Sequence, residues 1–324
     1  MGRRLLEVED LSVTFKTDRG IVRAVDSVSL YVDEGETLAI VGESGSGKSV
    51  TALSILGLIG DSDSGRIERG RISFEGQDLT TQDDATLRRI RGNRIAMIFQ
   101  EPMSSLNPVL TIGKQVAEPI RLHRGTSKAE AYEQAAELLQ KVAIPDAAER
   151  LNDFPHHFSG GMRQRVMIAM ALACRPKLII ADEPTTALDV TVQAQILSLL
   201  KELTREANSA LILITHDLGV VARYADRVTV MYAGRIVETA SARELYANPK
   251  HPYTQGLMES IPGLGGKARS RLITIEGQPP DLANLPEGCA FSPRCKFSRD
   301  LCLQKTPILE TVGENHERAC YGYE

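Results

Sequence analysis

The chain has 324 residues, and its 38 basic and 42 acidic side chains give a formal net charge of −4. This slightly acidic balance argues against nucleic-acid binding as the main function. The longest apolar run, residues 166–174, is far shorter than the roughly 20 residues of a membrane-spanning helix. The N-terminal residues become acidic before an apolar core builds up, so we expect no signal peptide. The composition therefore predicts a cytosolic protein of about two domains.

Hydrophobic patterning predicts the first elements in chain order. Residues 5–15 and 25–33 alternate between apolar and polar side chains, which predicts two strands. The apolar run 37–41 predicts a strand that is buried on both faces, and a helix is expected at 49–58. A longer helix is predicted at 127–142, where a serine occupies the position of the N-terminal cap.

Helices and strands alternate from residue 162 to residue 232. The predicted order is helix 162–174, strand 178–181, helix 190–207, strand 210–215, helix 218–224 and strand 227–232. Such an order is typical of an α/β domain with a parallel sheet.

The sequence changes character after Gly234. Eight of the 15 prolines lie between residues 249 and 307, and the hydrophobic periodicity becomes weak there. We therefore expect a boundary near 235–245. The prediction is an α/β domain over residues 1–235 and a small, irregular, cysteine-rich domain over residues 236–324.

A phosphate-binding pattern follows the predicted strand 37–41. Residues 42–49 read GESGSGKS and match G-x-x-x-x-G-K-S/T. Glycines allow backbone N–H groups to surround phosphates, and the N-terminus of the following helix favours anions. We expect Lys48 to neutralise the β- and γ-phosphates of ATP and the Ser49 hydroxyl to bind Mg²⁺. The residues expected to contact the nucleotide are Gly42, Ser44, Gly45, Ser46, Gly47, Lys48, Ser49 and Val50.

Two carboxylates end the predicted strand 178–181. Ligands of open α/β sheets bind at the carboxyl ends of the strands, so we expect this pair to approach the phosphate loop. Asp182 is a candidate ligand of Mg²⁺, and Glu183 is a candidate general base for the attacking water. Many strands end in a solvated acidic turn, so the pair gains meaning only together with the phosphate loop.

Residues 158–165 read FSGGMRQR, which resembles the L-S-G-G-Q signature of ATP-binding cassette (ABC) ATPases. Phe158 and Met162 depart from that form, whereas Ser159, Gly160 and Gly161 match it. The resemblance implies an ABC-type P-loop ATPase domain with a nested helical subdomain at about 100–165. It also implies that the three matching residues contact the ATP of a partner subunit in a head-to-tail dimer.

Three further positions resemble ABC motifs. Gln100 resembles the Q-loop glutamine, which senses Mg²⁺ and links to the membrane subunits. Residues 187–189 (ALD) resemble the D-loop, so Asp189 is expected near the nucleotide. His216 resembles the switch histidine, which contacts the γ-phosphate and stabilises the transition state. A lone histidine after a strand is more often structural, and only the complete set of motifs favours catalysis.

An aromatic side chain near the second strand is expected to stack on the adenine ring. Phe15 is the candidate, and Tyr31 is expected to be structural. Residues 17–22 look like an insertion between the first two strands.

Longer segments resemble the dipeptide, oligopeptide and nickel importer branch of the ABC family, and within it the D-type ATPase subunit. These segments are residues 100–108, 181–190 and 251–255. The resemblance implies a second ABC subunit of F-type, two transmembrane permease subunits and an extracytoplasmic substrate-binding protein. It places the chain at the cytoplasmic face of the inner membrane, with residues of about 100–125 docking the coupling helices of the permeases. Peptides are the expected cargo, and nickel chelates or glutathione-like compounds are the alternatives.

Two other functions compete with transport. A soluble ABC ATPase that acts on nucleic acid or the ribosome would carry tandem cassettes, a coiled-coil insertion or basic arms, and the sequence has none of these. A regulatory nucleotide-binding module without turnover is disfavoured by Glu183 and His216.

Four of the five cysteines cluster near the C-terminus, at Cys289, Cys295, Cys302 and Cys320. Their spacing names no metal, and a cytosolic location makes disulfides unfavourable. Four thiolates suit Zn²⁺ or a 4Fe–4S cluster, and unconnected buried thiols are the alternative. The surrounding sequence resembles the C-terminal extension of peptide-importer ATPases, some of which carry an iron–sulfur cluster. The resemblance implies a 4Fe–4S cluster first and zinc second, whereas Cys174 is expected in the core.

Overall fold

The computed structural model describes residues 2–18, 20–60, 65–186, 188–261 and 275–322. The chain divides into two compact units, each built from several segments. The first unit comprises residues 1–5, 32–36 and 81–214, and the second comprises residues 6–31, 37–80 and 215–324. Among the described residues, no helix combines the length and the apolar character that crossing a membrane requires.

The first unit contains three parallel strands, β6 (Ile95–Ile98), β7 (Leu178–Asp182) and β8 (Ala210–Thr215). Strand β7 pairs with β6 and with β8, in parallel in both cases. Every residue of β7 and β8 is buried, as expected for continuous apolar runs in a sheet that is covered on both faces. The predicted α/β architecture is confirmed here.

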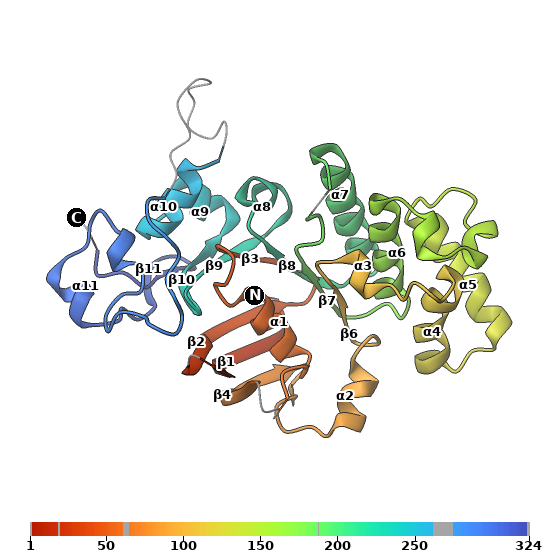
Figure 1. Cartoon of the computed structure of the whole chain (residues 1–324), viewed down its shortest axis with the longest axis horizontal. Coiled ribbons are helices and arrows are strands. Elements are labelled where there is room, and N and C mark those ends of the chain that lie inside the picture. Colours follow the sequence, from red (N-terminus) through yellow and green to blue (C-terminus); the bar gives the residue numbers. More distant parts are fainter. Residues whose placement is uncertain (1, 19, 61–64, 187, 262–274, 323–324) are drawn as a thin grey trace. The chain divides into compact units, whose positions relative to one another are not determined.

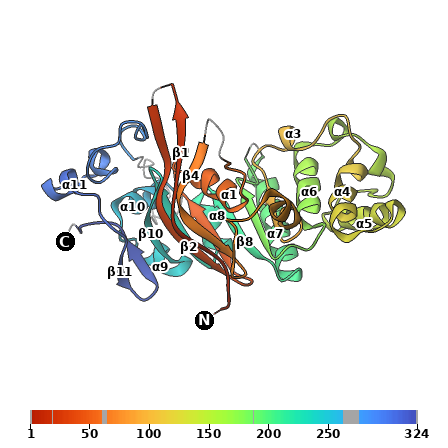
Figure 2. The same cartoon turned by 90° about the horizontal axis from the view of Figure 1, so that it is seen from below.

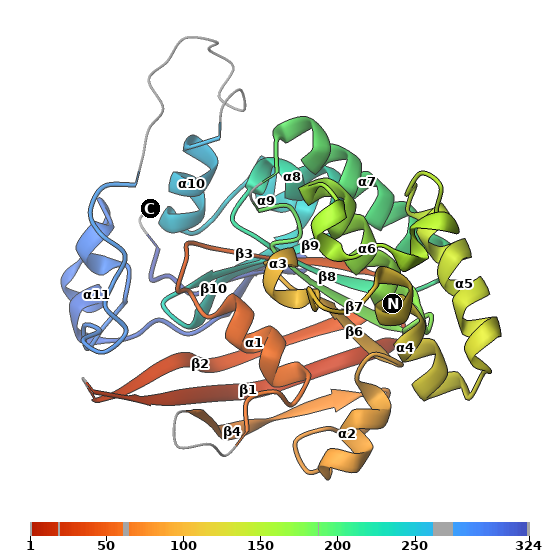
Figure 3. The same ribbon diagram turned by 45° about the vertical axis from the view of Figure 1, so that its right-hand side comes forward.

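Helices α4 (Ile112–Arg124), α5 (Lys128–Lys141) and α6 (Gly160–Leu172) of the first unit pack against one another (Figure 3). The side chain of Ser127 accepts from the Glu130 N–H, and Glu130 accepts from the Ser127 N–H, so the predicted cap of α5 is confirmed. The other elements of this unit are α2 (Asp84–Ile90), α3 (Pro102–Ser105), the 3₁₀ turns Glu149–Asn152 and Pro155–His157, and α7 (Val190–Glu206).

The second unit begins with an antiparallel sheet in the order β2-β1-β4-β5 (Figure 2). Its strands are β1 (Arg4–Thr17), β2 (Gly20–Asp33), β4 (Gly65–Phe74) and β5 (Gln77–Asp78). Because β1 continues to Thr17 and β2 starts at Gly20, the described part of 17–22 extends the two strands. Both strands are therefore longer than the sequence predicts.

A second sheet of this unit carries the phosphate loop and the C-terminal segment (Figure 1). Strand β3 (Thr37–Val41) pairs in parallel with β9 (Arg227–Tyr232), and β9 forms a hairpin with β10 (Arg235–Ser241). Strand β12 (His316–Arg318) pairs with β10 and with the outer strand β11 (Glu310–Gly313). The helices are α1 (Lys48–Ile55), α8 (Leu218–Tyr224), α9 (Ala242–Ala247), α10 (Pro252–Glu259) and α11 (Asp300–Gln304), with a 3₁₀ turn at Ser292–Arg294. The segment beyond residue 235 therefore continues the sheet that contains β3.

An aromatic core joins the C-terminal segment to β3 and β9. The ring centroids of Tyr232 and Tyr253 lie 4.6 Å apart, and those of Tyr253 and Phe291 lie 5.4 Å apart. These rings share one buried cluster with Val41 and Val230. The strand that leads into the phosphate loop therefore has a hydrophobic core in common with the residues after 250.

Glu238 supplies a buried polar anchor for the same segment. Its carboxylate is fully buried and accepts hydrogen bonds from the backbone N–H groups of Lys250 and His251 at 2.6 and 3.0 Å. His316 Nε2 lies 2.7 Å from the same carboxylate. One side chain thus ties β10 to the start of α10 and to β12, and its burial is compensated by these partners.

Candidate functional site

The phosphate loop joins β3 to α1, as the sequence predicts. Gly42 has φ 156°, and a Cβ there would lie 2.2 Å from the carbonyl oxygen of Met231. Gly47 has φ 99°, and a Cβ there would lie 2.5 Å from the carbonyl oxygen of Ala24. Neither position can accept a side chain without a backbone shift, so the glycines of this pattern are required by the loop's own neighbours.

The side chain of Lys48 lies along this loop. It is buried, and its Nζ donates to the carbonyl oxygens of Gly42 at 2.8 Å and Glu43 at 2.9 Å. The Ser46 hydroxyl is also buried and has no hydrogen-bond partner among the described residues. A buried cation beside a glycine-rich turn and a helix N-terminus is an arrangement that suits phosphate.

The other predicted contacts of the loop differ in exposure. Ser44 and Gly45 are exposed at its tip, and Ser49 and Val50 are half-buried in the first turn of α1.

Residues from the C-terminal segment also contact the loop, which the sequence did not indicate. The Tyr253 hydroxyl accepts from the Glu43 N–H at 2.8 Å, and Arg294 donates to both carboxylate oxygens of Glu43 at 2.7 and 3.0 Å. A cavity of about 100 Å³ lies beside this contact. It is lined by residues 43–46 and by Tyr232, Ala233, Pro279, Pro280 and Leu282.

The first unit brings the predicted base and the Q-loop glutamine together. Asp182 is buried at the end of β7, and Glu183 follows it with φ 45°. Gln100 Nε2 donates to Glu183 Oε2 at 3.1 Å, and the Thr186 hydroxyl donates to the same oxygen at 2.9 Å. A non-glycine residue with positive φ is a conformation that clusters at functional sites, and two hydrogen bonds fix the orientation of this carboxylate.

The signature residues begin α6. Ser159 is exposed and caps the helix, because its hydroxyl accepts from the Met162 N–H at 3.3 Å. Gly160 is exposed and Gly161 is half-buried in the first turn. Phe158, which replaces the usual leucine, is buried. Phe158 therefore replaces leucine at a buried position, and the exposed Ser159 and Gly160 still match the signature.

Asp189 caps α7, and its side chain accepts from the N–H groups of Thr191 and Val192. Ala187 of the same predicted D-loop lies outside the described residues. In the second unit His216 is exposed, follows the end of β8 and precedes Asp217, the N-terminal cap of α8.

The two aromatic candidates differ in their surroundings. Phe15 is half-buried on β1, opposite Gly65 of β4. The Arg227 guanidinium lies 3.7 Å from the centre of the Tyr31 ring and also donates to the Tyr31 carbonyl oxygen. Tyr31 is thus held by a cation–π contact, and the assignment of Phe15 to the adenine stays a prediction.

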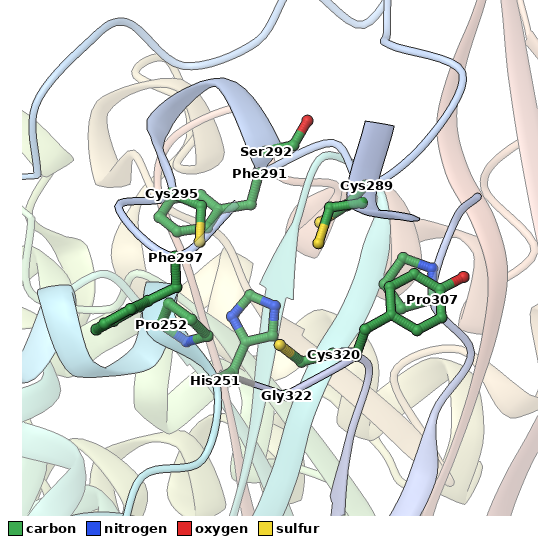
Figure 4. A pocket seen from close by; sticks show the side chains of 12 residues that line it. His251, Pro252, Cys289, Phe291, Ser292, Cys295, Phe297, Pro307, Cys320 and Gly322 are labelled. Atoms are coloured by element: carbon green, nitrogen blue, oxygen red, sulfur yellow. The ribbon is translucent and has the colours of Figure 1, made fainter. Parts of the chain in front are cut away.

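The four C-terminal cysteines line one cavity. Figure 4 shows the sulfur atoms of Cys289, Cys295 and Cys320 turned toward a common space, with His251 beside it. All of these thiols are free, and Cys302 also lines the cavity. The structure therefore brings together the four cysteines that the sequence analysis grouped.

Burial governs the chemistry of these thiols. Desolvation raises the pKa of Cys289 to about 11 and raises the pKa of Cys295 and Cys320. Among the described residues, no group of three or more His, Cys, Asp or Glu side chains is arranged to hold a metal ion. Four sulfurs on one tetrahedral zinc ion would lie about 3.8 Å apart, so the thiols do not form a ready-made single-ion site. The predicted metal centre stays a prediction.

Cys174 lies apart from this cavity in the core of the first unit. It is buried directly after α6, and its thiol donates to the Pro119 carbonyl oxygen at 3.4 Å. Its predicted core position is confirmed.

Two family models match the chain. Residues 25–186 match the ABC transporter family, and residues 237–302 match the C-terminal region of the oligopeptide/dipeptide transporters. The oligopeptide transport ATP-binding protein OppD of Haemophilus influenzae is 53% identical, over 98% of this chain and 97% of that protein. OppD of Bacillus subtilis is 53% identical, over 97% of this chain and 87% of that protein.

A solved structure is similar to the fold. It is the dimeric post-hydrolysis state of the ATP-binding cassette MJ0796 bound to ADP and phosphate, with a TM-score of 0.66 and 32% identity. The match covers 74% of this chain and 99% of that cassette. With these motifs and relatives, the chain belongs to the ATP-binding subunits of the oligopeptide and dipeptide ABC transporters.

Proposed function

We propose that this chain hydrolyses ATP to drive an importer of peptides. It is an ABC ATPase, and its relatives include oligopeptide transport ATP-binding proteins across nearly its whole length. The observation that carries the proposal is the Gln100–Glu183 hydrogen bond beside Thr186, because it orients a carboxylate as a general base requires. Nickel chelates or glutathione-like compounds are the alternative cargoes.

Each compact unit contributes its own part to the proposed chemistry. In the first unit Glu183 accepts the proton of the attacking water, and Gln100 and Thr186 hold its carboxylate. In the second unit Lys48 and the loop N–H groups bind the phosphates, and His216 contacts the γ-phosphate. Phe15 stacks on the adenine.

Magnesium and a partner subunit complete this proposal. Mg²⁺, when bound, neutralises charge on the phosphates, and Ser49, Gln100 and Asp182 are its proposed ligands. At the interface with a second ABC subunit, the nucleotide lies near four residues of this chain, namely Ser159, Gly160, Gly161 and Asp189.

Replacing Glu183 tests the proposed base. Glu183→Gln should lower the rate of ATP hydrolysis by about 10²–10⁴-fold, because general-base catalysis contributes on that scale. MgATP binding should persist, since the amide keeps the shape of the side chain. Glu133→Gln, on the exposed face of α5, is the matched control. An unchanged rate in Glu183→Gln would show that Glu183 is not the general base.

A groove on the first unit is the proposed docking site of a permease. It has a volume of about 280 Å³ and is lined by Met97, Phe99, Leu122, Met167 and Met170, among others. Phe99 is 41% exposed and Leu122 is 74% exposed, so apolar side chains are available to a partner. Leu122→Asp should keep the basal ATPase rate and remove its stimulation by the permeases, and full stimulation would place the docking site elsewhere.

We propose that the four C-terminal thiols bind a 4Fe–4S cluster, with zinc as the alternative. When bound, the group cross-links the segments that carry the thiols and so stabilises a region with little regular structure. Iron and acid-labile sulfide measured in protein purified without oxygen should accompany a brown colour. A colourless protein that contains zinc would support the same ligands with the other metal, and metal-free protein would overturn both.

The remaining partners follow from the same family. We propose two permeases, a substrate-binding protein outside the membrane and a distinct F-type ATPase subunit, with the chain attached at the cytoplasmic face of the inner membrane. Mass spectrometry of the intact complex would separate an F-type partner from a second copy of this chain. Peptide binding by the cognate binding protein would identify the cargo.

A further inference from the structure

Arg294 lies beside the phosphate loop and forms several hydrogen bonds there. Its side chain is only 6% exposed. The guanidinium donates to both carboxylate oxygens of Glu43, to the Glu276 carbonyl oxygen at 3.0 Å and to the Tyr232 hydroxyl at 3.3 Å. Such a bidentate pair is among the stronger and more geometrically specific hydrogen-bonded contacts in proteins.

Glu43 is held by the C-terminal segment at two points. Arg294 binds its side chain, and the Tyr253 hydroxyl accepts from its backbone N–H at 2.8 Å. Tyr253 is fully buried, so this hydroxyl has a fixed position. The second residue of the phosphate loop is therefore fixed in both its backbone and its side chain.

The charge of Glu43 makes this contact important for an anionic ligand. A carboxylate in a loop that binds a triphosphate repels the phosphates unless a cation neutralises it. The hydrogen bonds with Glu43 also raise the pKa of Arg294 above its ordinary value, so the guanidinium stays charged. Removing it would leave a partly buried carboxylate unpaired beside the ligand.

We propose that Arg294 is a positioning residue of the nucleotide site, which neutralises and orients Glu43 so that the C-terminal segment sets the affinity of the phosphate loop. This inference rests on the proposed function in one respect, namely that the loop binds ATP. It adds a residue from outside the cassette motifs to that site.

The position of Arg294 in the chain connects the loop to the thiol cavity. The 3₁₀ turn that carries it lies between Cys289 and Cys295, and the Ser292 N–H donates to the Cys289 carbonyl oxygen at 2.9 Å. The Cys295 N–H in turn donates to the Ser292 carbonyl oxygen at 3.3 Å. Whatever fixes these two thiols therefore also fixes the turn from which Arg294 reaches Glu43.

A charge-rescue experiment on the full-length chain tests the proposal. The dissociation constant for MgATP and the split between KM and kcat are measured for wild type, Arg294→Ala and the double variant Glu43→Gln/Arg294→Ala. Arg243→Ala, an exposed arginine on α9, is the matched control. Arg294→Ala should weaken MgATP binding by about ten-fold, raise KM and leave kcat nearly unchanged.

The double variant should regain most of the lost affinity, because it lacks the unpaired carboxylate. Added salt should also reduce the deficit of Arg294→Ala by screening the repulsion. Equal weakness of the single and double variants, or wild-type affinity in Arg294→Ala, would overturn the proposal. Failure of the wild-type chain to bind MgATP would instead overturn the proposed function, so the two failures are distinguishable.

Discussion

The phosphate loop and the thiol cavity belong to the same compact unit, and they are built in opposite ways. The loop is formed by eight consecutive residues, and its shape is fixed by glycines whose missing side chains leave room for Met231 and Ala24. The cavity is formed by thiols spread from residue 289 to residue 320 and by His251, so only tertiary packing assembles it. The ligand-binding residues of the loop come from one continuous stretch, whereas those of the cavity come from distant segments and depend on everything that holds these segments together.

The strongest test of this difference removes the cation of the loop. Lys48→Ala should weaken MgATP binding by roughly 100-fold, because a charge-assisted contact with phosphate is lost. Iron and sulfide content should stay at the wild-type level, since the cavity does not need the loop. Both quantities are measured on one preparation. A parallel loss of metal would show that the loop supports the cavity.

Alanine substitutions at two glycines of the loop test whether close backbone contacts fix its shape. Gly47→Ala should lower the free energy of unfolding by about 2–3 kcal/mol, because its Cβ would meet the Ala24 carbonyl oxygen at 2.5 Å in a left-handed conformation. Gly45→Ala has open space around its Cβ, so only the conformational cost of about 1 kcal/mol applies. Urea unfolding of both variants gives the comparison. Equal losses of unfolding free energy in the two variants would mean that the close contact with Ala24 is not the reason why position 47 requires glycine.

Removing one thiol tests the assembled site. Cys302→Ser should abolish iron and sulfide binding and lower the melting temperature by several degrees. It should also weaken MgATP binding by about two- to three-fold, less than Arg294→Ala does, because it only loosens the turn that carries Arg294. Cys174→Ser is the matched control, and this variant should keep the iron and sulfide content of the wild type. Full retention of the cluster in Cys302→Ser would remove this residue from the ligand set.

The smallest effect concerns Cys174 itself. Burial raises the pKa of its thiol, which reacts only as thiolate, so alkylation of the folded chain should leave it unmodified. In metal-free protein Cys302, which is partly exposed, should react before the buried Cys174. Mass spectrometry of peptides after a short treatment measures the order. Early modification of Cys174 would mean that α6 opens locally at its C-terminal end.

Short motifs made most of the cassette predictable. Three features depend on residues that are close together in sequence, so the sequence alone reveals them. They are the phosphate loop, the pair at Asp182 and Glu183, and the capped helix α5. Strands β3, β7, β8 and β9 were predictable because their continuous apolar runs are typical of strands in a sheet that is covered on both faces. Strand β6 was not predicted.

Contacts between distant residues were not predictable. Arg294 and Glu43 are 251 positions apart, and neither residue type is unusual where it stands. The same holds for His316 and Glu238, 78 positions apart, and for Gln100 and Glu183, 83 positions apart, whose hydrogen bond the sequence analysis did not predict. The continuation of strands β1 and β2 through the expected insertion was missed because polar residues at a hairpin end resemble a loop.

The pairing of β12 with β10 has a consequence for aggregation. Strand β10 would be the edge of its sheet without β12, and its unpaired N–H and C=O groups would lie on a strand that also carries Ile236, Val237 and Ala240. In the folded chain the short hairpin of β11 and β12 occupies that edge and presents Glu310, Thr311 and Glu317 at the rim. The C-terminal hairpin thus prevents β10 from pairing with a strand of another molecule. A chain shortened before residue 310 should therefore self-associate, even if its nucleotide site is intact.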